Sequence, residues 1–126
     1  MRFLHTCIRV KDLEASVKFY KEALGFIEAG RKDVPADEFT LVYMKLPNSD
    51  HELELTYNYG HEAYDLGNGY SHIALGIHAD EFEKLHAKHK AAGYEVTEMY
   101  GIAGEPPSIY FITDPDGYDI EIIKEK

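Results

Sequence analysis

The sequence has little cysteine, few basic residues and no long apolar run, and each of these shortages excludes a class of protein. Its single cysteine, Cys7, allows no internal disulfide framework and fits a reducing compartment. Lysine and arginine number 13 against 23 aspartates and glutamates, and the net charge of −10 argues against a nucleic-acid surface. No apolar run is long enough to span a membrane, and residues 1–10 read as a strand rather than a secretion signal. We therefore expect a soluble cytoplasmic protein with neither nucleic acid nor membrane as a partner.

What the sequence does contain is sufficient for a folded core. Of its 126 residues, 44% are hydrophobic and 29% are charged, which is not a disordered composition. A chain of this length can bury a core without disulfides or a structural metal, so one compact unit built from two small halves is expected.

The two halves, about 1–60 and 69–126, repeat one order of elements. Each begins with a β-rich run, at 3–10 and at 71–77. A helix follows, at 13–24 after a capping Asp12 and at 80–92, and a glycine ends each helix. Strands are then expected at 39–46 and 52–57 in the first half, and at 108–113 and 118–123 in the second. His86 and His89 lie three apart on a charged helix face and are expected to be solvated.

One histidine and one glutamate occupy matching places in each half, His5 with Glu54 and His72 with Glu121. The spacing is the same in both, because 54 − 5 and 121 − 72 both equal 49. Leucine or isoleucine flanks each glutamate and points into a packed layer, so the carboxylate faces the other way and needs a partner there. Two imidazoles and two carboxylates suit a divalent metal with one or two waters. Any one of these residues alone would be an ordinary strand residue; the shared spacing is what predicts a single metal site.

Four stretches over nearly the whole chain carry a family resemblance: LHTCIRV at 4–10, ELTYN at 54–58, GYSHIA at 69–74 and DPDGYDIE at 114–121. They resemble glyoxalase I (lactoylglutathione lyase) of the vicinal oxygen chelate superfamily. The resemblance implies an α+β fold, a single glyoxalase-type domain spanning 1–126 in which tandem βαβββ modules form a curved-sheet metal-binding cavity. The family's metal ligands fall on His5, Glu54, His72 and Glu121. A histidine as first ligand and a short chain resemble the nickel- or cobalt-dependent bacterial type more than the zinc type.

The resemblance also implies an activity. The family isomerises the hemithioacetal of methylglyoxal and glutathione to S-lactoylglutathione, by proton transfer through a metal-stabilised enediolate. Such a reaction needs a base and a Lewis acid. By resemblance Glu121 is the main catalytic base and Glu54 its counterpart for the opposite hand of the hemithioacetal. Arg9 and Asn58 match substrate-binding positions that contact the γ-glutamyl end of the thiol.

One departure from the family concerns the thiol, because no lysine or arginine lies between Tyr94 and Ile123, where the family usually has a basic residue. The sequence leaves open the thiol, the metal, and whether the site combines modules of one chain or of two, although a homodimer is expected. Cys7 shares the face of His5 and is interpreted as a cavity-wall residue. Two other functions stay open: an acyl-CoA epimerase, which shares the proton-transfer chemistry, and a metal-free drug- or small-molecule-binding protein, which would need no ligand set.

Overall fold

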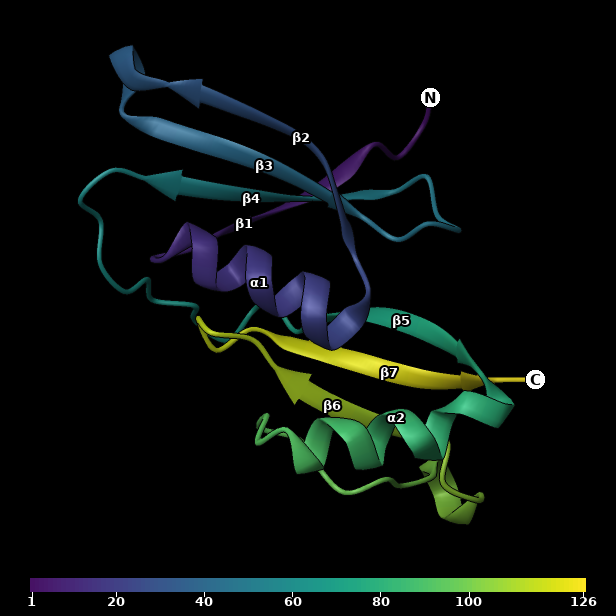
Figure 1. Cartoon of the computed structure of the whole chain (residues 1–126). Coiled ribbons are helices and arrows are strands. Elements are labelled where there is room, and N and C mark those ends of the chain that lie inside the picture. Colours follow the sequence, from purple (N-terminus) through teal and green to yellow (C-terminus); the bar gives the residue numbers. More distant parts are fainter. The chain divides into compact units, whose positions relative to one another are not determined.

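A computed structural model describes all residues, 1–126, and divides the chain into two compact units, Met1–Asp65 and Leu66–Lys126. Both units combine a small sheet with one long helix (Figure 1). The α+β class expected from the sequence is confirmed.

The first unit contains a mixed four-stranded sheet. Its elements are β1 (His5–Arg9), α1 (Leu13–Leu24), β2 (Ile27–Val34), β3 (Phe39–Lys45) and β4 (Glu52–Asn58), with a 3-10 turn at Pro35–Asp37. The strands lie in the order β1-β4-β3-β2, and only β1 and β4 are parallel. The first unit is therefore a βαβββ module, as the family resemblance implies.

Helix α1 covers one face of this sheet and leaves the other face available for a site. It begins where the Asp12 side chain accepts a hydrogen bond from the Ala15 amide at 3.1 Å, and it ends at Gly25, which has a left-handed φ of 75°. Alternate residues of β3 and β4 are buried on the helix side, among them Val42 and Leu55, both with 0% of their surface exposed. The residues between them, which include Glu54, are only half-buried and line the opposite face.

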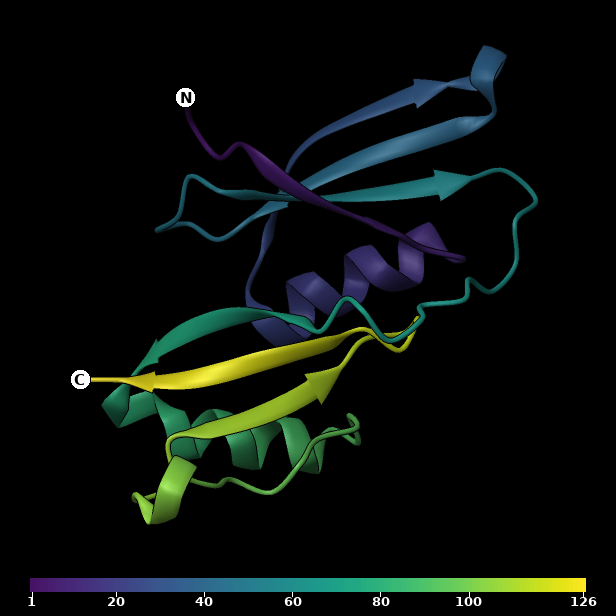
Figure 2. The same cartoon turned by 180° about the vertical axis from the view of Figure 1, so that it is seen from behind.

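The second unit repeats this plan with one strand fewer. It consists of β5 (His72–His78), α2 (Ala79–Ala91), a 3-10 turn at Ile102–Gly104, β6 (Ile109–Thr113) and β7 (Asp119–Glu125). The strand order is β5-β7-β6, and β5 and β7 are parallel (Figure 2). In place of a counterpart to β2 there are two isolated bridges, from Val96 to Ile112 and from Tyr100 to Ile109. Two glycines and two prolines within 101–107 explain the missing strand, since neither residue supports a regular ladder.

The second helix is packed differently from what the sequence suggested. His86 and His89 were expected to be solvated, and this is wrong, because they are only 5% and 1% exposed. His86 donates from Nε2 to the Thr97 carbonyl at 2.8 Å, and His89 Nδ1 is hydrogen-bonded to the Tyr110 hydroxyl at 2.9 Å. Because residues outside the helix supply these hydrogen bonds, both imidazoles can be buried without an unsatisfied polar group.

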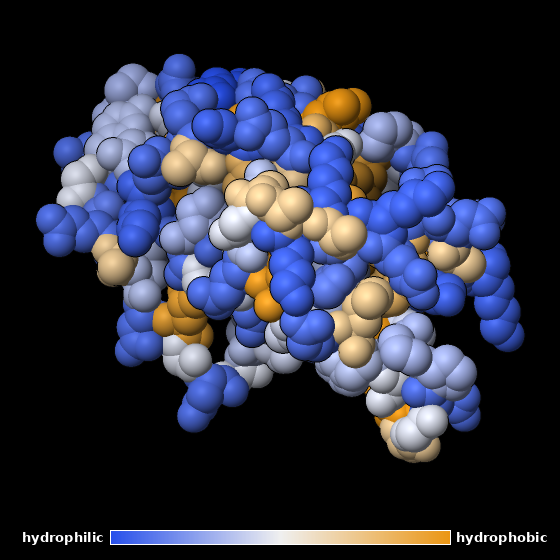
Figure 3. All heavy atoms as spheres, turned by 60° about the horizontal axis from the view of Figure 1, so that its bottom comes forward, coloured by the Kyte–Doolittle hydropathy of each residue, from blue (hydrophilic) through white to orange (hydrophobic).

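On the face drawn in Figure 3, hydrophilic residues predominate and apolar residues appear only in small groups, as the acidic composition suggests. Neither helix has the length and apolar character needed to cross a membrane.

Candidate metal centre

The first unit brings His5 and Glu54 together on the face of its sheet that α1 does not cover. His5 is the first residue of β1, and Glu54 lies in the middle of the parallel neighbour β4, opposite Cys7 in the register. The His5 Nε2 atom lies 3.1 Å from Glu54 Oε2, and the two side chains are 39% and 12% exposed. The Nε2 edge of the imidazole and one carboxylate oxygen thus face each other within hydrogen-bond distance.

The second unit builds the same pair from its own strands. His72 is the first residue of β5, and Glu121 lies on the parallel neighbour β7, opposite Ala74. The His72 Nε2 atom lies 3.4 Å from Glu121 Oε1, with the side chains 30% and 16% exposed. Ser71 Oγ lies 2.6 Å from His72 Nδ1 and fixes the ring with Nε2 toward the carboxylate. In both units the glutamate sits opposite the residue two places after the histidine, so the equal sequence spacing reflects equal strand pairing.

These pairs have the chemistry of half a metal site. Imidazole nitrogen and carboxylate oxygen are the donors that Ni²⁺, Co²⁺ and catalytic Zn²⁺ accept in proteins. Neither unit gathers three or more His, Cys, Asp or Glu side chains that could hold a metal ion. Each unit therefore brings together one imidazole and one carboxylate.

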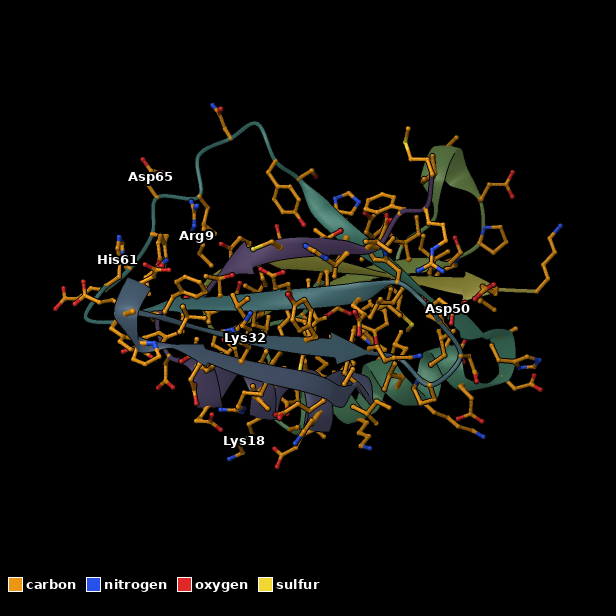
Figure 4. All side chains as sticks on the ribbon, turned by 90° about the horizontal axis from the view of Figure 1, so that it is seen from above. Arg9, Lys18, Lys32, Asp50, His61 and Asp65 are labelled. Atoms are coloured by element: carbon orange, nitrogen blue, oxygen red, sulfur yellow. The ribbon has the colours of Figure 1, made fainter.

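The two substrate-binding candidates, Arg9 and Asn58, both lie in the first unit, at the ends of β1 and β4. Period-two alternation puts them on the same face as His5 and Glu54. Asn58 donates from Nδ2 to the Tyr64 hydroxyl at 2.9 Å. Figure 4 shows Arg9 toward the same end of this sheet as His61, and Asp50 toward the opposite end. Both side chains therefore lie one strand-length away from the histidine, where they could meet a remote part of a substrate.

Cys7 lies beside the pair of the first unit. Its Sγ is 3.2 Å from Thr56 Oγ1. Burial raises the pKa of the Cys7 thiol, and the charge of Glu54 adds to this rise. A thiol with a raised pKa stays protonated at neutral pH, so Cys7 behaves as a weak donor and not as a thiolate ligand.

Sequence reasoning assigned no role to three side chains around the pairs, namely Tyr43, Thr56 and Ser71. Alternation along 52–58 does place Thr56 on the face of Glu54, so a signal for that residue existed. Tyr43 comes from a different strand, and only the β3–β4 register puts it opposite Glu54.

The chain belongs to the glyoxalase/bleomycin resistance protein/dioxygenase superfamily, whose family model matches residues 2–122. Within that class, its relatives point to one enzyme. The lactoylglutathione lyase of Neisseria meningitidis serogroup A is 41% identical over 128 residues, which cover 100% of this chain and 92% of that protein. The lactoylglutathione lyase of Haemophilus influenzae is 38% identical over 129 residues, with coverage of 100% and 94%.

Solved structures agree with these relatives. The trypanothione-dependent glyoxalase I of Leishmania major superposes with a TM-score of 0.88 at 39% identity, covering 99% of this chain and 87% of that one. Glyoxalase I of Zea mays gives a TM-score of 0.88 at 36% identity and covers 98% of this chain but 44% of that longer one. The resemblance to glyoxalase I drawn from the sequence is thereby confirmed.

Proposed function

We propose that this protein is a metal-dependent glyoxalase I, which isomerises the hemithioacetal of methylglyoxal and a thiol to the lactoyl thioester. One observation carries the proposal: each unit holds a histidine–glutamate pair, at 3.1 Å and 3.4 Å, at the same positions of its strand register. Full-length relatives that are 38% and 41% identical are lactoylglutathione lyases, which supports glutathione as the thiol.

In this proposal His5, Glu54, His72 and Glu121 together hold one divalent cation. A cation bound there acts as a Lewis acid and favours the negative charge that develops on the substrate oxygens when a C–H proton leaves. The donor set fits such an ion, since two imidazoles and two carboxylates leave room for substrate or water.

The proton itself is moved by the protein. Glu121 takes the proton from the carbon that bears sulfur and returns it to the neighbouring carbonyl carbon, so the reaction conserves atoms and needs no redox partner. Glu54 is the corresponding group in the first unit. At the end of the same face, Arg9 is suited to pair with the carboxylate of the thiol's γ-glutamyl end, and Asn58 to hydrogen-bond it.

Three finer features belong to the same proposal. The metal is nickel or cobalt rather than zinc, because histidine and not glutamine occupies the first ligand position. The protein is a homodimer; Phe3 and Leu4, 80% and 55% exposed just before β1, offer apolar surface that a subunit contact would cover. It resides in the cytoplasm, where a single unpaired Cys7 stays reduced. Sedimentation and the metal content of the purified protein test the first two features.

The activity is tested by reconstitution. Metal-stripped protein is given Ni²⁺, Co²⁺, Mn²⁺ or Zn²⁺ and assayed with methylglyoxal plus glutathione or trypanothione, following thioester formation by ultraviolet absorbance. We expect turnover only with metal, and loss of turnover in His72→Ala. His78→Asn is the matched control, because it alters an exposed histidine of β5 while keeping a side chain able to cap α2. Metal binding with no thioester formation, but with epimerisation of an acyl-CoA, would replace this function by the epimerase.

A further inference from the structure

The two glutamates of the metal centre have different neighbours, although their pairs with histidine are alike. In the first unit the Thr56 hydroxyl donates to Glu54 Oε1 at 3.1 Å, while the other oxygen, Oε2, faces His5. Because Thr56 donates to the carboxylate, its oxygen is left to accept from the Cys7 thiol at 3.2 Å. A short chain of hydrogen bonds thus holds the carboxylate of Glu54 in one orientation.

Tyr43 adds a third polar group beside the same carboxylate. It lies directly opposite Glu54 on the antiparallel strand β3, and its ring packs against His5 at a centroid distance of 5.8 Å. The phenol also hydrogen-bonds to Glu54, so it is a further donor beside the carboxylate.

The second unit has no such donors at the matching places. Glu121 faces Ala74 across the parallel pair and Phe111 across the antiparallel pair, and Ile123 follows it by two residues on β7. These three are the register counterparts of Cys7, Tyr43 and Thr56, and none of them carries a hydrogen-bond donor in its side chain. Phe111 instead packs edge-on against His72, with a centroid distance of 5.0 Å.

The difference bears on how freely each carboxylate moves. A charge-assisted hydrogen bond fixes the side-chain torsions of the group that accepts it, and breaking it has a cost. Glu121, whose neighbours in the strand register are Ala, Phe and Ile, can rotate away from its histidine without losing such a bond to any of them. One glutamate is thus held and the other is free to swing.

We propose that Thr56 is a positioning residue, which holds Glu54 as a fixed metal ligand and keeps it from replacing Glu121 as the base. This inference rests on the proposed function for its catalytic part only. Its other part, the hold on Glu54, concerns metal binding and can be measured without turnover.

The first experiment measures metal affinity of the full-length protein by competition with a chromophoric chelator. Thr56→Val keeps the shape of a β-branched residue and removes the hydroxyl, whereas Thr56→Ser keeps it. We expect Thr56→Val to weaken Ni²⁺ affinity about 10- to 100-fold, the usual effect of losing a group that orients a ligand, and Thr56→Ser to restore most of it. Ile123→Val, a matched change at the counterpart position, should leave affinity unchanged. Equal affinities of Thr56→Val and wild type, both folded by circular dichroism, would overturn the proposal.

The second experiment asks whether Thr56 keeps Glu54 from acting as a base. Glu121→Gln is assayed at saturating Ni²⁺ with and without Thr56→Val. Release of Glu54 should raise the residual turnover of the double variant above that of the single one, whereas a merely structural role would lower it. The sign of the change decides between them.

A third experiment introduces a hydroxyl at the matching position of the second unit. Ile123→Thr gives Glu121 a donor two residues along the same strand, as Thr56 is to Glu54. Turnover is expected to fall by about 10-fold or more with the metal content unchanged. If wild type binds metal and shows no isomerase activity, the proposed function fails while the affinity experiment still judges Thr56. Normal turnover in Ile123→Thr would mean that a hydroxyl at this place does not restrain a glutamate, which would overturn the role of Thr56 and leave the proposed function intact.

Discussion

Removal of the metal should leave the protein folded but less stable. Each unit has its own apolar core, with fully buried Leu55 and Met44 in the first and Phe82, Ile112 and Ile120 in the second. Burial of each such side chain stabilises the fold by roughly 1.5–3 kcal/mol, so neither core depends on an ion. The four proposed ligands lie on the sheet faces away from these residues.

The size of the metal effect follows from mass action. At a free metal concentration 100 times the dissociation constant, binding adds about 2.7 kcal/mol to the free energy of unfolding. For a chain of this length about 1 kcal/mol raises the melting temperature by roughly 3–5 °C, so the expected shift is on the order of 10 °C. Thermal melts followed by circular dichroism, with chelator and with added Ni²⁺, measure it.

Variants of single ligands make the experiment selective. If one ion is held by both pairs, His5→Ala and His72→Ala should each remove most of the shift, although the histidines belong to different units. A metal-free protein without secondary structure would make the site structural and refute the reasoning. A full shift that survives in His72→Ala would mean that the pair of the first unit binds metal alone.

Three further variants test other parts of the structure. Glu121→Gln should keep the metal and lose at least ~10²-fold in turnover, measured at saturating metal on samples of known metal content, because it can no longer take a proton. Tyr110→Phe should cost about 1–3 kcal/mol in urea unfolding, since it leaves buried His89 without its 2.9 Å partner. Arg31 lowers the pKa of Glu28 through a hydrogen bond, so this pair stabilises the fold above the ordinary carboxyl pKa and stops doing so as pH falls through the lowered value. Arg31→Met should therefore cost under ~1 kcal/mol near pH 7 and less near pH 3, by urea unfolding at both.

The histidine–glutamate pairs could be predicted from the sequence because parallel strand pairing is regular. A histidine at the start of the first strand and a glutamate in the last strand meet whenever those strands are neighbours in one register. The spacing of 49 residues is equal in both halves because the strands pair in the same register. Whether all four residues bind one ion stays a prediction.

The packing of α2 could not be predicted in the same way. The charged composition of 79–91 hides the fact that His86 and His89 find partners on Thr97 and Tyr110. These partners come from the segment after the helix and from β6, so no pattern within the helix predicts them. Periodicity along a helix indicates which face is apolar, but it does not indicate whether polar side chains on another face find hydrogen-bond partners elsewhere in the chain.

The difference between the two glutamates was hidden by a single residue of loop length. A constant offset of 67 between the halves pairs Glu54 with Glu121 correctly, but it pairs Tyr43 with Tyr110, a buried residue hydrogen-bonded to His89. The strand register pairs Tyr43 with Phe111 instead, because each lies opposite its glutamate. The offset changes because the loop between β3 and β4 spans 46–51, six residues, whereas that between β6 and β7 spans 114–118, five residues. Because the second loop is one residue shorter, every residue of β6 lies one place away from the position that the offset of 67 predicts. The phenol of Tyr43 beside Glu54 therefore has the phenyl ring of Phe111 as its counterpart beside Glu121. A change of loop length between duplicated halves can in this way separate a fixed ligand from a mobile base while both ligand pairs are kept.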